Sequence, residues 1–169
     1  MDFLKITTEK FEELKCLQAA YKTEIGETRP DENDFDRLRK AIEQEKINFY
    51  GCVCDDKLVE CCSVCLTYST FNYDISGVFE DFYIIPEYRH QGIAGKLVKF
   101  AYKSSKVASL TVGCADCDVA MYNAVGFRIP LGNMYAFEEL SIHANSGRLL
   151  MTRNIKKRRF SGIHINFRT

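Results

Sequence analysis

A short stretch with two glycines stands where an apolar segment gives way to a helix-like one, at residues 86–96. Its sequence is Pro-Glu-Tyr-Arg-His-Gln-Gly-Ile-Ala-Gly-Lys. The first backbone N–H groups of a helix have no partner within the helix and carry its positive end, so a helix that begins here can bind an anion. Glycines let the main chain approach that anion closely. The stretch therefore predicts a phosphate site made mainly of backbone N–H groups.

Two common phosphate motifs do not fit this stretch. A Walker loop requires glycine five positions before Gly95, where this chain has His90, and Ser or Thr after the lysine, where it has Leu97. The stretch does not contain the G-x-G-x-x-G dinucleotide fingerprint either. The pattern that remains is Arg89-x-x-Gly92-x-Ala94.

The elements before this loop follow from the spacing of apolar residues. Residues 3–8 alternate as a short strand, and helical spacing follows over 11–21 and again over 35–42, after a break at Pro30. A period of two then appears in residues 47–53 and 58–68, with turn residues between them. The first part of the chain predicts one strand, two helices and a hairpin.

The second part of the chain predicts a strand–helix–strand unit around the loop. A polar loop at 72–77 leads to residues 78–85, whose nearly continuous apolar character is typical of a central strand covered on both faces. A helix from Gly92, a strand at 110–114 and a short helix from Asp118 to Val125 follow. Further strand-like segments lie at 128–131, 134–137 and 149–155. We expect a single α/β domain over residues 1–140, with a mixed, mostly antiparallel sheet flanked by helices, and a strand and basic tail over 141–169 that are part of this domain or appended to it.

Length and composition limit the classes of protein to which this chain can belong. The chain has 169 residues, 46% of them hydrophobic and 27% charged, which is typical of one globular domain. Lys and Arg together number 23, as do Asp and Glu, so net charge gives no argument for nucleic acid or an anionic membrane as a partner. We find no leader-like or bilayer-spanning segment and expect a cytoplasmic protein whose eight cysteines are free thiols.

Two motifs of this chain, and the order in which they occur, resemble those of the GNAT superfamily of N-acetyltransferases. The first is Glu-Asp-Phe-Tyr-Ile-Ile-Pro-Glu-Tyr-Arg-His-Gln-Gly-Ile-Ala-Gly-Lys-Leu at 80–97, and the second is Ala-Met-Tyr-Asn-Ala-Val-Gly-Phe at 120–127. The first motif is closest to the diamine and polyamine acetyltransferase branch. The resemblance covers roughly residues 1–140 and implies acetyl-CoA as co-substrate and no metal. The chain departs from the family pattern at Ala94, a tolerated replacement of glycine, and at Ala115, where the family often has an asparagine that contacts the cofactor.

The resemblance implies two sets of site residues. Expected to bind acetyl-CoA are Phe82, Ile84, Arg89, His90, Gln91, Gly92, Ala94, Gly95 and Lys96. Expected to act in catalysis are Glu80 as the base, Tyr122 as the acid, and Asp81 as a reserve base or as the group that orients a cationic amine. Because successive side chains of a strand face opposite sides, we expect only one of the two carboxylates to reach the cleft.

The chemistry explains why these groups are needed. A free alkyl amine has a pKa of about 10.4 and is almost fully protonated at neutral pH, so a base must remove a proton before the nitrogen can attack. Tyrosine, with a pKa near 10, can return a proton to the thiolate that leaves. The predicted reaction is direct acetyl transfer to a primary amine, with small cationic amines favoured.

Other functions remain open on the sequence alone. A CoA-binding sensor without catalysis is the alternative, and Ala115 favours it. The spacings Cys62-x-x-Cys65 and Cys114-x-x-Cys117 occur in zinc sites, but residues three apart in a regular strand point to opposite faces, so we interpret these thiols as small apolar groups. The acceptor amine is not identified by the sequence, and a homodimer is as compatible with the resemblance as a monomer.

Overall fold

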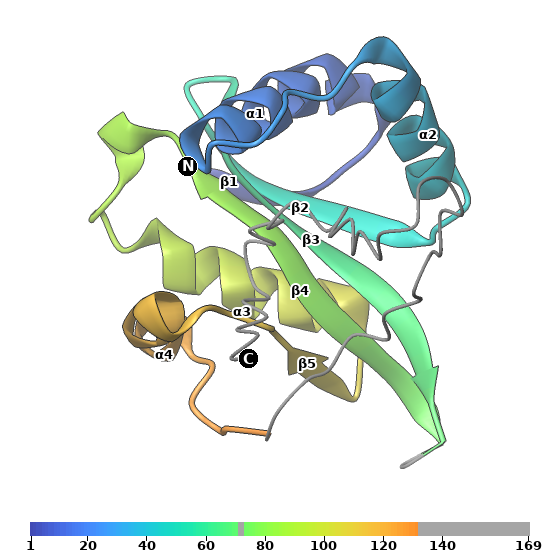
Figure 1. Cartoon of the computed structure of the whole chain (residues 1–169), viewed down its shortest axis with the longest axis vertical. Helices are drawn as coiled ribbons and strands as arrows, with labels where there is room; N and C mark the ends of the chain where they lie inside the picture. The colour runs from blue at the N-terminus through green and yellow to red at the C-terminus, as the bar shows by residue number, and fades with distance from the viewer. Residues whose placement is uncertain (71–72, 132–169) are drawn as a thin grey trace, which may run out of the picture.

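The computed structural model describes residues 1–70 and 73–131. They form one five-stranded sheet in the order β1-β2-β3-β4-β5 (Figure 1). The strands are β1 (Asp2–Ile6), β2 (Ile47–Cys54), β3 (Lys57–Ser69), β4 (Asp74–Ile84) and β5 (Ser109–Thr111). The helices are α1 (Phe11–Glu24), α2 (Glu32–Glu43), α3 (Ile93–Ser105) and α4 (Val119–Val125). Neighbouring strands are antiparallel except β4 and β5, which are parallel, so the predicted mixed, mostly antiparallel α/β fold is confirmed.

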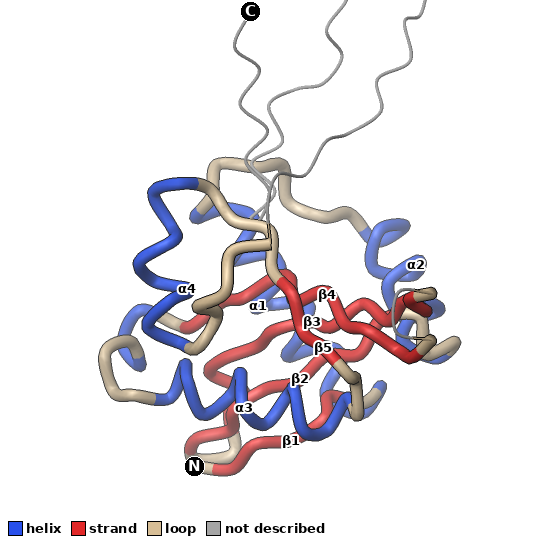
Figure 2. The backbone as a smooth tube through the Cα atoms, turned by 90° about the horizontal axis from the view of Figure 1, so that it is seen from below, coloured by secondary structure: helices blue, strands red, loops and turns tan. Residues whose placement is uncertain are grey.

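Helices cover both faces of the sheet (Figure 2). Helix α1 packs on β3 and β4 of one face and α2 on β2, whereas α3 packs on β1, β2 and β3 of the other face and contacts α4. Each face has its own apolar core because side chains alternate along each strand. Phe49, Cys61 and Tyr83 lie in the core under α1, and Tyr50, Cys62 and Phe79 lie in the core under α3. Strand β4, which the sequence predicted to be central, is the fourth of the five strands, beside the short edge strand β5. It contributes Phe79 to one core and Tyr83 to the other, so it is covered on both faces as its apolar sequence predicted.

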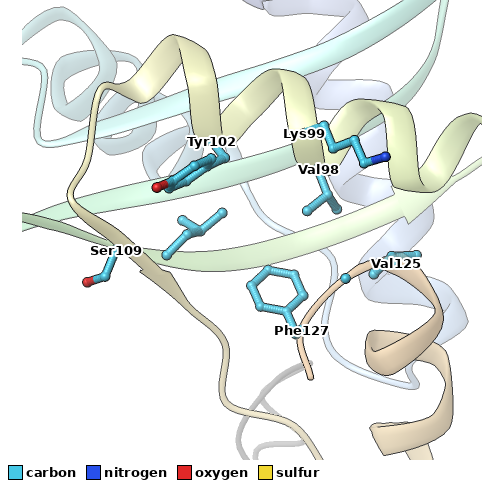
Figure 3. Close-up of a pocket in the computed structure, with 8 residues that line it drawn as sticks. Val98, Lys99, Tyr102, Ser109, Val125 and Phe127 are labelled. Atoms are coloured by element: carbon cyan, nitrogen blue, oxygen red, sulfur yellow. The ribbon is translucent and has the colours of Figure 1, made fainter. Parts of the chain in front are cut away.

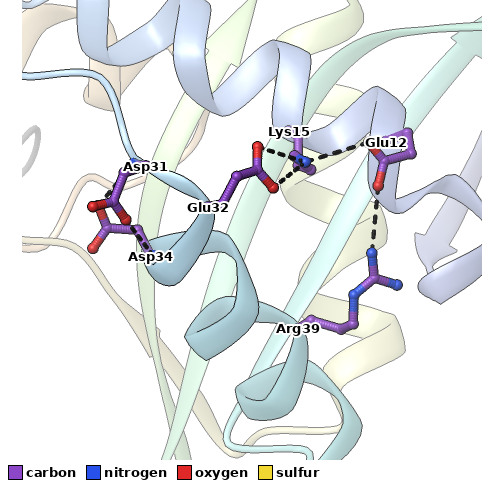
Figure 4. A network of polar contacts seen from close by, with 6 residues as sticks. All are labelled: Glu12, Lys15, Asp31, Glu32, Asp34 and Arg39. Carbon is purple, nitrogen blue, oxygen red and sulfur yellow. Dashed lines mark hydrogen bonds and ion pairs between the residues drawn. The ribbon is translucent and has the colours of Figure 1, made fainter.

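A polar network joins the first two helices (Figure 4). The Lys15 ammonium of α1 lies 2.9 Å from a carboxylate oxygen of Glu32 in α2, and Glu12 of α1 accepts a hydrogen bond of 3.4 Å from Arg39 of α2. Asp31 and Asp34 form a capping box at the start of α2. The side chain of each accepts a hydrogen bond from the backbone N–H of the other. The network positions α1, whose carboxyl-terminal end reaches the functional site.

Strands β4 and β5 pair over only three residues. Ser76, Gly77 and Val78 of β4 pair with Ser109, Leu110 and Thr111 of β5. Beyond Val78, β4 continues to Ile84 while β5 has ended. The carboxyl end of β4 therefore extends beyond its pairing with β5.

Two predicted strand boundaries and one predicted strand differ from the structure. Strand β4 begins at Asp74 rather than after Gly77, because the long strand β3 supplies pairing partners for this polar segment from Leu66 to Ser69. Strand β5 ends at Thr111 rather than at 114. Residues 128–131 form no strand and are exposed, and Pro130 lacks the N–H that a ladder needs.

Several predictions fall outside the described residues. They are the strands at 134–137 and 149–155, the domain boundary at 140, and the basic tail. All eight cysteines are described, and all are free thiols. Among the residues that the structure describes, no helix is long and apolar enough to span a bilayer.

Candidate functional site

The loop before α3 places the backbone N–H groups of a helix start close to the carboxyl end of β4. After a short 3₁₀ turn at Pro86–Tyr88, His90 has φ 61° and Gly92 has φ 73°. Both residues are thus left-handed, a conformation that glycine adopts without strain and other residues rarely do. Gly92 is the N-cap of α3, and no side chain caps this helix start. A helix thus starts after the glycine loop, as the sequence predicted, and its first N–H groups have no side-chain cap.

A cleft of about 700 Å³ lies against this helix start. The carboxyl end of β4, the loop 89–92 and the first turn of α3 form one side of it, and α4 and the end of α1 form the other. Its walls combine the apolar side chains of Ile25, Phe82, Ile93 and Val125 with the polar groups of Tyr21 and Tyr122. A cleft of this size, lined mostly by apolar groups and ending at a helix start, can accept an elongated phosphate-bearing ligand.

Most of the residues expected to bind the cofactor line this cleft. They are Phe82, Ile84, Arg89, His90, Gly92, Ala94 and Gly95. Gln91 and Lys96 do not line it: both are exposed, and the Gln91 amide donates a hydrogen bond of 2.9 Å to the Glu87 carbonyl. The path of the backbone through the loop and the first turn of α3 decides which of these side chains face the cleft. The sequence pattern did not show this.

Arg89 is held by protein groups rather than left free for a phosphate. Its Nε donates to the Ile84 carbonyl at 2.9 Å, and its Nη2 donates to Glu24 Oε2 of α1 at 2.6 Å. The guanidinium also lies 5.7 Å from the centre of the Tyr83 ring. The hydrogen bond to Glu24 raises the pKa of Arg89 above its ordinary value. Arg89 therefore joins the loop to α1.

The two candidate carboxylates lie at a β-bulge in β4. Cys61 pairs with Tyr83 and Ser63 with Glu80, so Cys62 faces two residues of β4 instead of one. Asp81 is at this bulge with φ 51°, a strained conformation for a residue other than glycine. The bulge interrupts the alternation of side chains that a regular strand imposes.

Because of the bulge, both carboxylates contact side chains of the same face of β3. Ser63 Oγ donates to Asp81 Oδ2 at 3.4 Å, and Cys65 Sγ donates to Glu80 Oε2 at 3.4 Å. Ser63 and Cys65 are two residues apart on β3 and thus face the same way. The expectation that Glu80 and Asp81 face opposite sides was wrong, because it assumed a regular strand.

The environments of these carboxylates differ. Burial raises the pKa of Asp81, and the positive charge of Lys22 opposes this rise only in part. Lys22 itself forms an ion pair with Glu27 at 2.9 Å.

The position of the carboxylates relative to the cleft is a separate matter. Glu80 is half-buried. Neither carboxylate is among the residues that line the 700 Å³ cleft, although Phe82, the residue after Asp81, does line it. The acidic pair thus lies beside the cleft, on the α1 face of β4.

Tyr122 of α4 lines the cleft and is only 4% exposed. Its ring packs edge-on against Phe127 with centroids 5.9 Å apart, in the core under α3. Burial, and after it the negative charge of Asp118, raises the pKa of Tyr122. The hydroxyl therefore keeps its proton at neutral pH, which a general acid requires.

Tyr21 belongs to the site although the sequence indicated only a helical apolar stripe. It lines the cleft from α1, and its buried hydroxyl has no hydrogen-bond partner among the described residues. Burial raises the pKa of Tyr21, and the charge of Asp81 adds to the rise, so Tyr21 and the acidic pair are electrostatically coupled. A tyrosine among the leucines of an amphipathic helix was the signal available in the sequence.

The cysteine spacings do not form a metal site in the structure. Cys62 lies in the core under α3, whereas Cys65 contacts Glu80 on the other face, as their spacing in a strand predicted. Over residues 1–70 and 73–131, no cluster of three or more potential metal ligands occurs.

A second cavity of about 380 Å³ lies between α3, β5 and the end of α4 (Figure 3). Val98, Leu110, Val125 and Phe127 supply its apolar lining. None of the residues predicted to bind or react lies in it. The larger cleft is therefore the candidate active site.

Comparisons with known proteins agree with this fold. A family model described as an acetyltransferase (GNAT) domain matches residues 45–129, which include the bulge, the loop and Tyr122. No curated protein matches the sequence.

Solved structures share the fold at low sequence identity. The crystal structure of a probable acetyltransferase is 22% identical, with a TM-score of 0.72 over 84% of this chain and 99% of that one. A predicted acetyltransferase from Clostridium acetobutylicum, solved with acetyl-CoA, is 12% identical, with a TM-score of 0.65 over 80% of this chain and 95% of that one. An aminoglycoside acetyltransferase from an uncultured soil metagenomic sample, in complex with sisomicin, is 12% identical, with a TM-score of 0.69 over 83% of this chain and 96% of that one.

Proposed function

Because the chain belongs to the GNAT acetyltransferase family, we propose that it transfers the acetyl group of acetyl-CoA directly to a primary amine, with small cationic amines favoured. One observation carries this proposal. The uncapped start of α3, with Gly92 left-handed, opens onto a cleft that also contains Tyr122, and the carboxylates of the β4 bulge lie beside that cleft. These features support the proposal, because the reaction needs a site for the diphosphate, a proton donor and a proton acceptor near one another.

The residues of the cleft fit acetyl-CoA. The first N–H groups of α3 would hold the diphosphate, and Phe82, Ile84 and Ile93 would contact the apolar arm. When bound, acetyl-CoA supplies an acetyl thioester. Arg89 holds the loop in place through Ile84 and Glu24 and does not need to contact the diphosphate itself.

Glu80 and Tyr122 are assigned the two proton transfers. Glu80, which is half-buried and thus open to water, takes a proton from the amine directly or through a water molecule. The amine nitrogen then forms its bond to the acetyl carbon as the bond to sulfur breaks. Tyr122 gives its hydroxyl proton to the sulfur, and the acetylated nitrogen loses its second proton, directly or through water, to the tyrosinate, which restores Tyr122. Because the amine attacks the thioester directly, no covalent enzyme intermediate is needed.

The charges near the bulge favour a cationic acceptor. The nearby cations are already paired, Arg89 with Glu24 at 2.6 Å and Lys22 with Glu27 at 2.9 Å. Glu80 and Asp81 accept their hydrogen bonds from a thiol and a hydroxyl, both neutral donors. An ammonium group that approaches the bulge therefore meets negative charge.

Release of free CoA thiol tests the proposal. The purified protein should release thiol from acetyl-CoA when spermidine, an aminoglycoside or an amino acid amide is added, and little without an amine. The acceptor with the highest kcat/KM identifies the substrate class. Binding of CoA with no amine-dependent release by any of the three would contradict the proposed reaction.

Replacing Tyr122 by phenylalanine should lower kcat about a hundredfold and leave the Kd for acetyl-CoA within about threefold, since it removes only the proton donor from a ring that stays packed against Phe127. Steady-state kinetics and calorimetry measure the two quantities. Tyr102→Phe removes an exposed hydroxyl of α3 outside the cleft and is the control. Unchanged turnover in Tyr122→Phe would remove Tyr122 from the mechanism.

A further inference from the structure

We propose that Cys65 is a positioning residue, whose thiol holds the Glu80 carboxylate in the orientation that the reaction requires. This inference rests on the proposed function, in which Glu80 is the base. It assigns a role to a cysteine that the sequence analysis had interpreted as a small apolar group.

The register of the hairpin brings these two residues together. Cys65 of β3 pairs with Val78 of β4, and Glu80 pairs with Ser63. Cys65 and Glu80 are thus diagonal neighbours on one face of two antiparallel strands, a separation that a long side chain can span. The Glu80 side chain spans it, and its Oε2 lies 3.4 Å from Cys65 Sγ.

The thiol is the donor in this contact. A carboxylate oxygen only accepts, so the proton between the two atoms belongs to sulfur. Burial, and after it the negative charge of Glu80, raises the pKa of Cys65 to about 12, so the thiol stays protonated over the working range of pH. A thiol of this kind is a poor nucleophile, and its contribution is orientation rather than covalent chemistry.

Each carboxylate of the bulge has its own donor on β3. Ser63 donates to Asp81 and Cys65 donates to Glu80, both at 3.4 Å. A change at position 65 should therefore act on Glu80 and leave the hydrogen bond to Asp81 in place. The two positions can be tested separately.

The test replaces Cys65 by alanine and by serine and measures kcat/KM against pH with spermidine as acceptor. Loss of a donor disfavours the charged carboxylate, so Cys65→Ala should move the acid limb of the profile upward by about half a pH unit to one unit. Cys65→Ser keeps a donor and should return the limb to within about 0.3 pH unit of the wild-type position.

The matched control is Cys54, whose thiol makes the same kind of contact outside the site. Cys54 Sγ lies 3.6 Å from Asp55 Oδ2 at the end of β2. Cys54→Ala should leave the acid limb unchanged. Thermal unfolding of each variant verifies that it is folded.

A second measurement does not depend on turnover. In Glu80→Gln the charge that opposes the Cys65 thiolate is gone, so iodoacetamide at pH 9 should alkylate Cys65 at least about twofold faster than in the wild-type protein. Peptide mass spectrometry measures this rate, with the exposed Cys16 and Cys117 as internal references.

The outcomes separate this proposal from the proposed function. An acid limb that stays in place in Cys65→Ala overturns the role of Cys65 alone, and so does a shift that serine does not reverse, because that result indicates packing. A wild-type protein that releases no thiol with any amine overturns the proposed function first, and this proposal with it.

Discussion

Replacing Glu80 by glutamine lowers kcat/KM for the amine acceptor by a factor of about 10² to 10⁴, the usual range for loss of a general base. Glutamine keeps the size of the side chain and can still accept from Cys65, so the fold and the 3.4 Å contact should persist. It cannot take a proton from an amine. The expected result is a low kcat with a Kd for acetyl-CoA that is close to the wild-type value, because the carboxylate lies beside the cleft rather than in its lining.

Asp81→Asn is the matched variant for this experiment. Asp81 is adjacent to Glu80 and carries the same group, but it is held by Ser63 at the left-handed position of the bulge. We expect Asp81→Asn to raise the KM for a cationic amine more than it lowers kcat, since an anionic group that orients an ammonium acts in binding. The opposite pattern, with full activity in Glu80→Gln and a hundredfold loss of kcat in Asp81→Asn, would assign the base to Asp81.

The free energy of unfolding should fall by about 3 kcal/mol between pH 4.5 and pH 7 because of one buried side chain, Glu60. Glu60 lies in the middle of β3, opposite Cys52 of β2 and Ile84 of β4. It is 0% exposed, and neither carboxyl oxygen has a hydrogen-bond partner among the described residues. Burial away from water disfavours the charged form and raises the pKa of Glu60 to about 8.

The sign of this effect follows from proton binding. The model value for the unfolded chain is 4.5, so between pH 4.5 and about 8 the folded protein holds a proton that the unfolded chain releases. Stability therefore decreases as pH rises through this window, by about 1.4 kcal/mol per pH unit, and the contribution levels off above pH 8. Below pH 4.5 the group is protonated in both states and has no effect.

Urea unfolding of Glu60→Gln at several pH values measures the contribution. Glutamine resembles the neutral carboxyl group in shape and does not titrate, so the variant should match the wild-type protein near pH 4.5 and exceed it by about 3 kcal/mol at pH 7. Glu43→Gln, a replacement at the exposed end of α2, should change stability by less than about 0.5 kcal/mol at each pH. A difference between Glu60→Gln and wild type that does not grow with pH would show that Glu60 has an ordinary carboxyl environment.

Local sequence was sufficient to predict the helix start after the glycine loop and the helices around it. Gly92 and the apolar spacing after it predicted a helix start, and the structure has Gly92 as the N-cap of α3. The break at Pro30 predicted the start of the second helix, and Asp31, the next residue, caps this helix with its side chain. These features depend on residues within one or two turns of each other, so the physics that forms them is contained in the local sequence.

Features that depend on strand register were not predictable in this way. Position 65 contacts position 80, and the Arg89 guanidinium binds Glu24, which is 65 residues away in the chain. The alternation rule failed at Asp81 because a bulge depends on how two strands pair, which the sequence of one strand does not show. Asp74–Gly77 had the composition of a loop, and pairing with β3 made it a strand.

Periodicity and a glycine-containing turn act locally, so the residues alone were enough to indicate the fold class and the family, and they predict a backbone site for a diphosphate. Only the folded chain shows that Glu80 and Asp81 share a face, that Cys65 and Ser63 contact them, and that Glu60 is buried with no hydrogen-bond partner among the described residues. The physical reason is that burial and side-chain contacts across a sheet depend on the register of the strands, and the register is set by the packing of the whole domain.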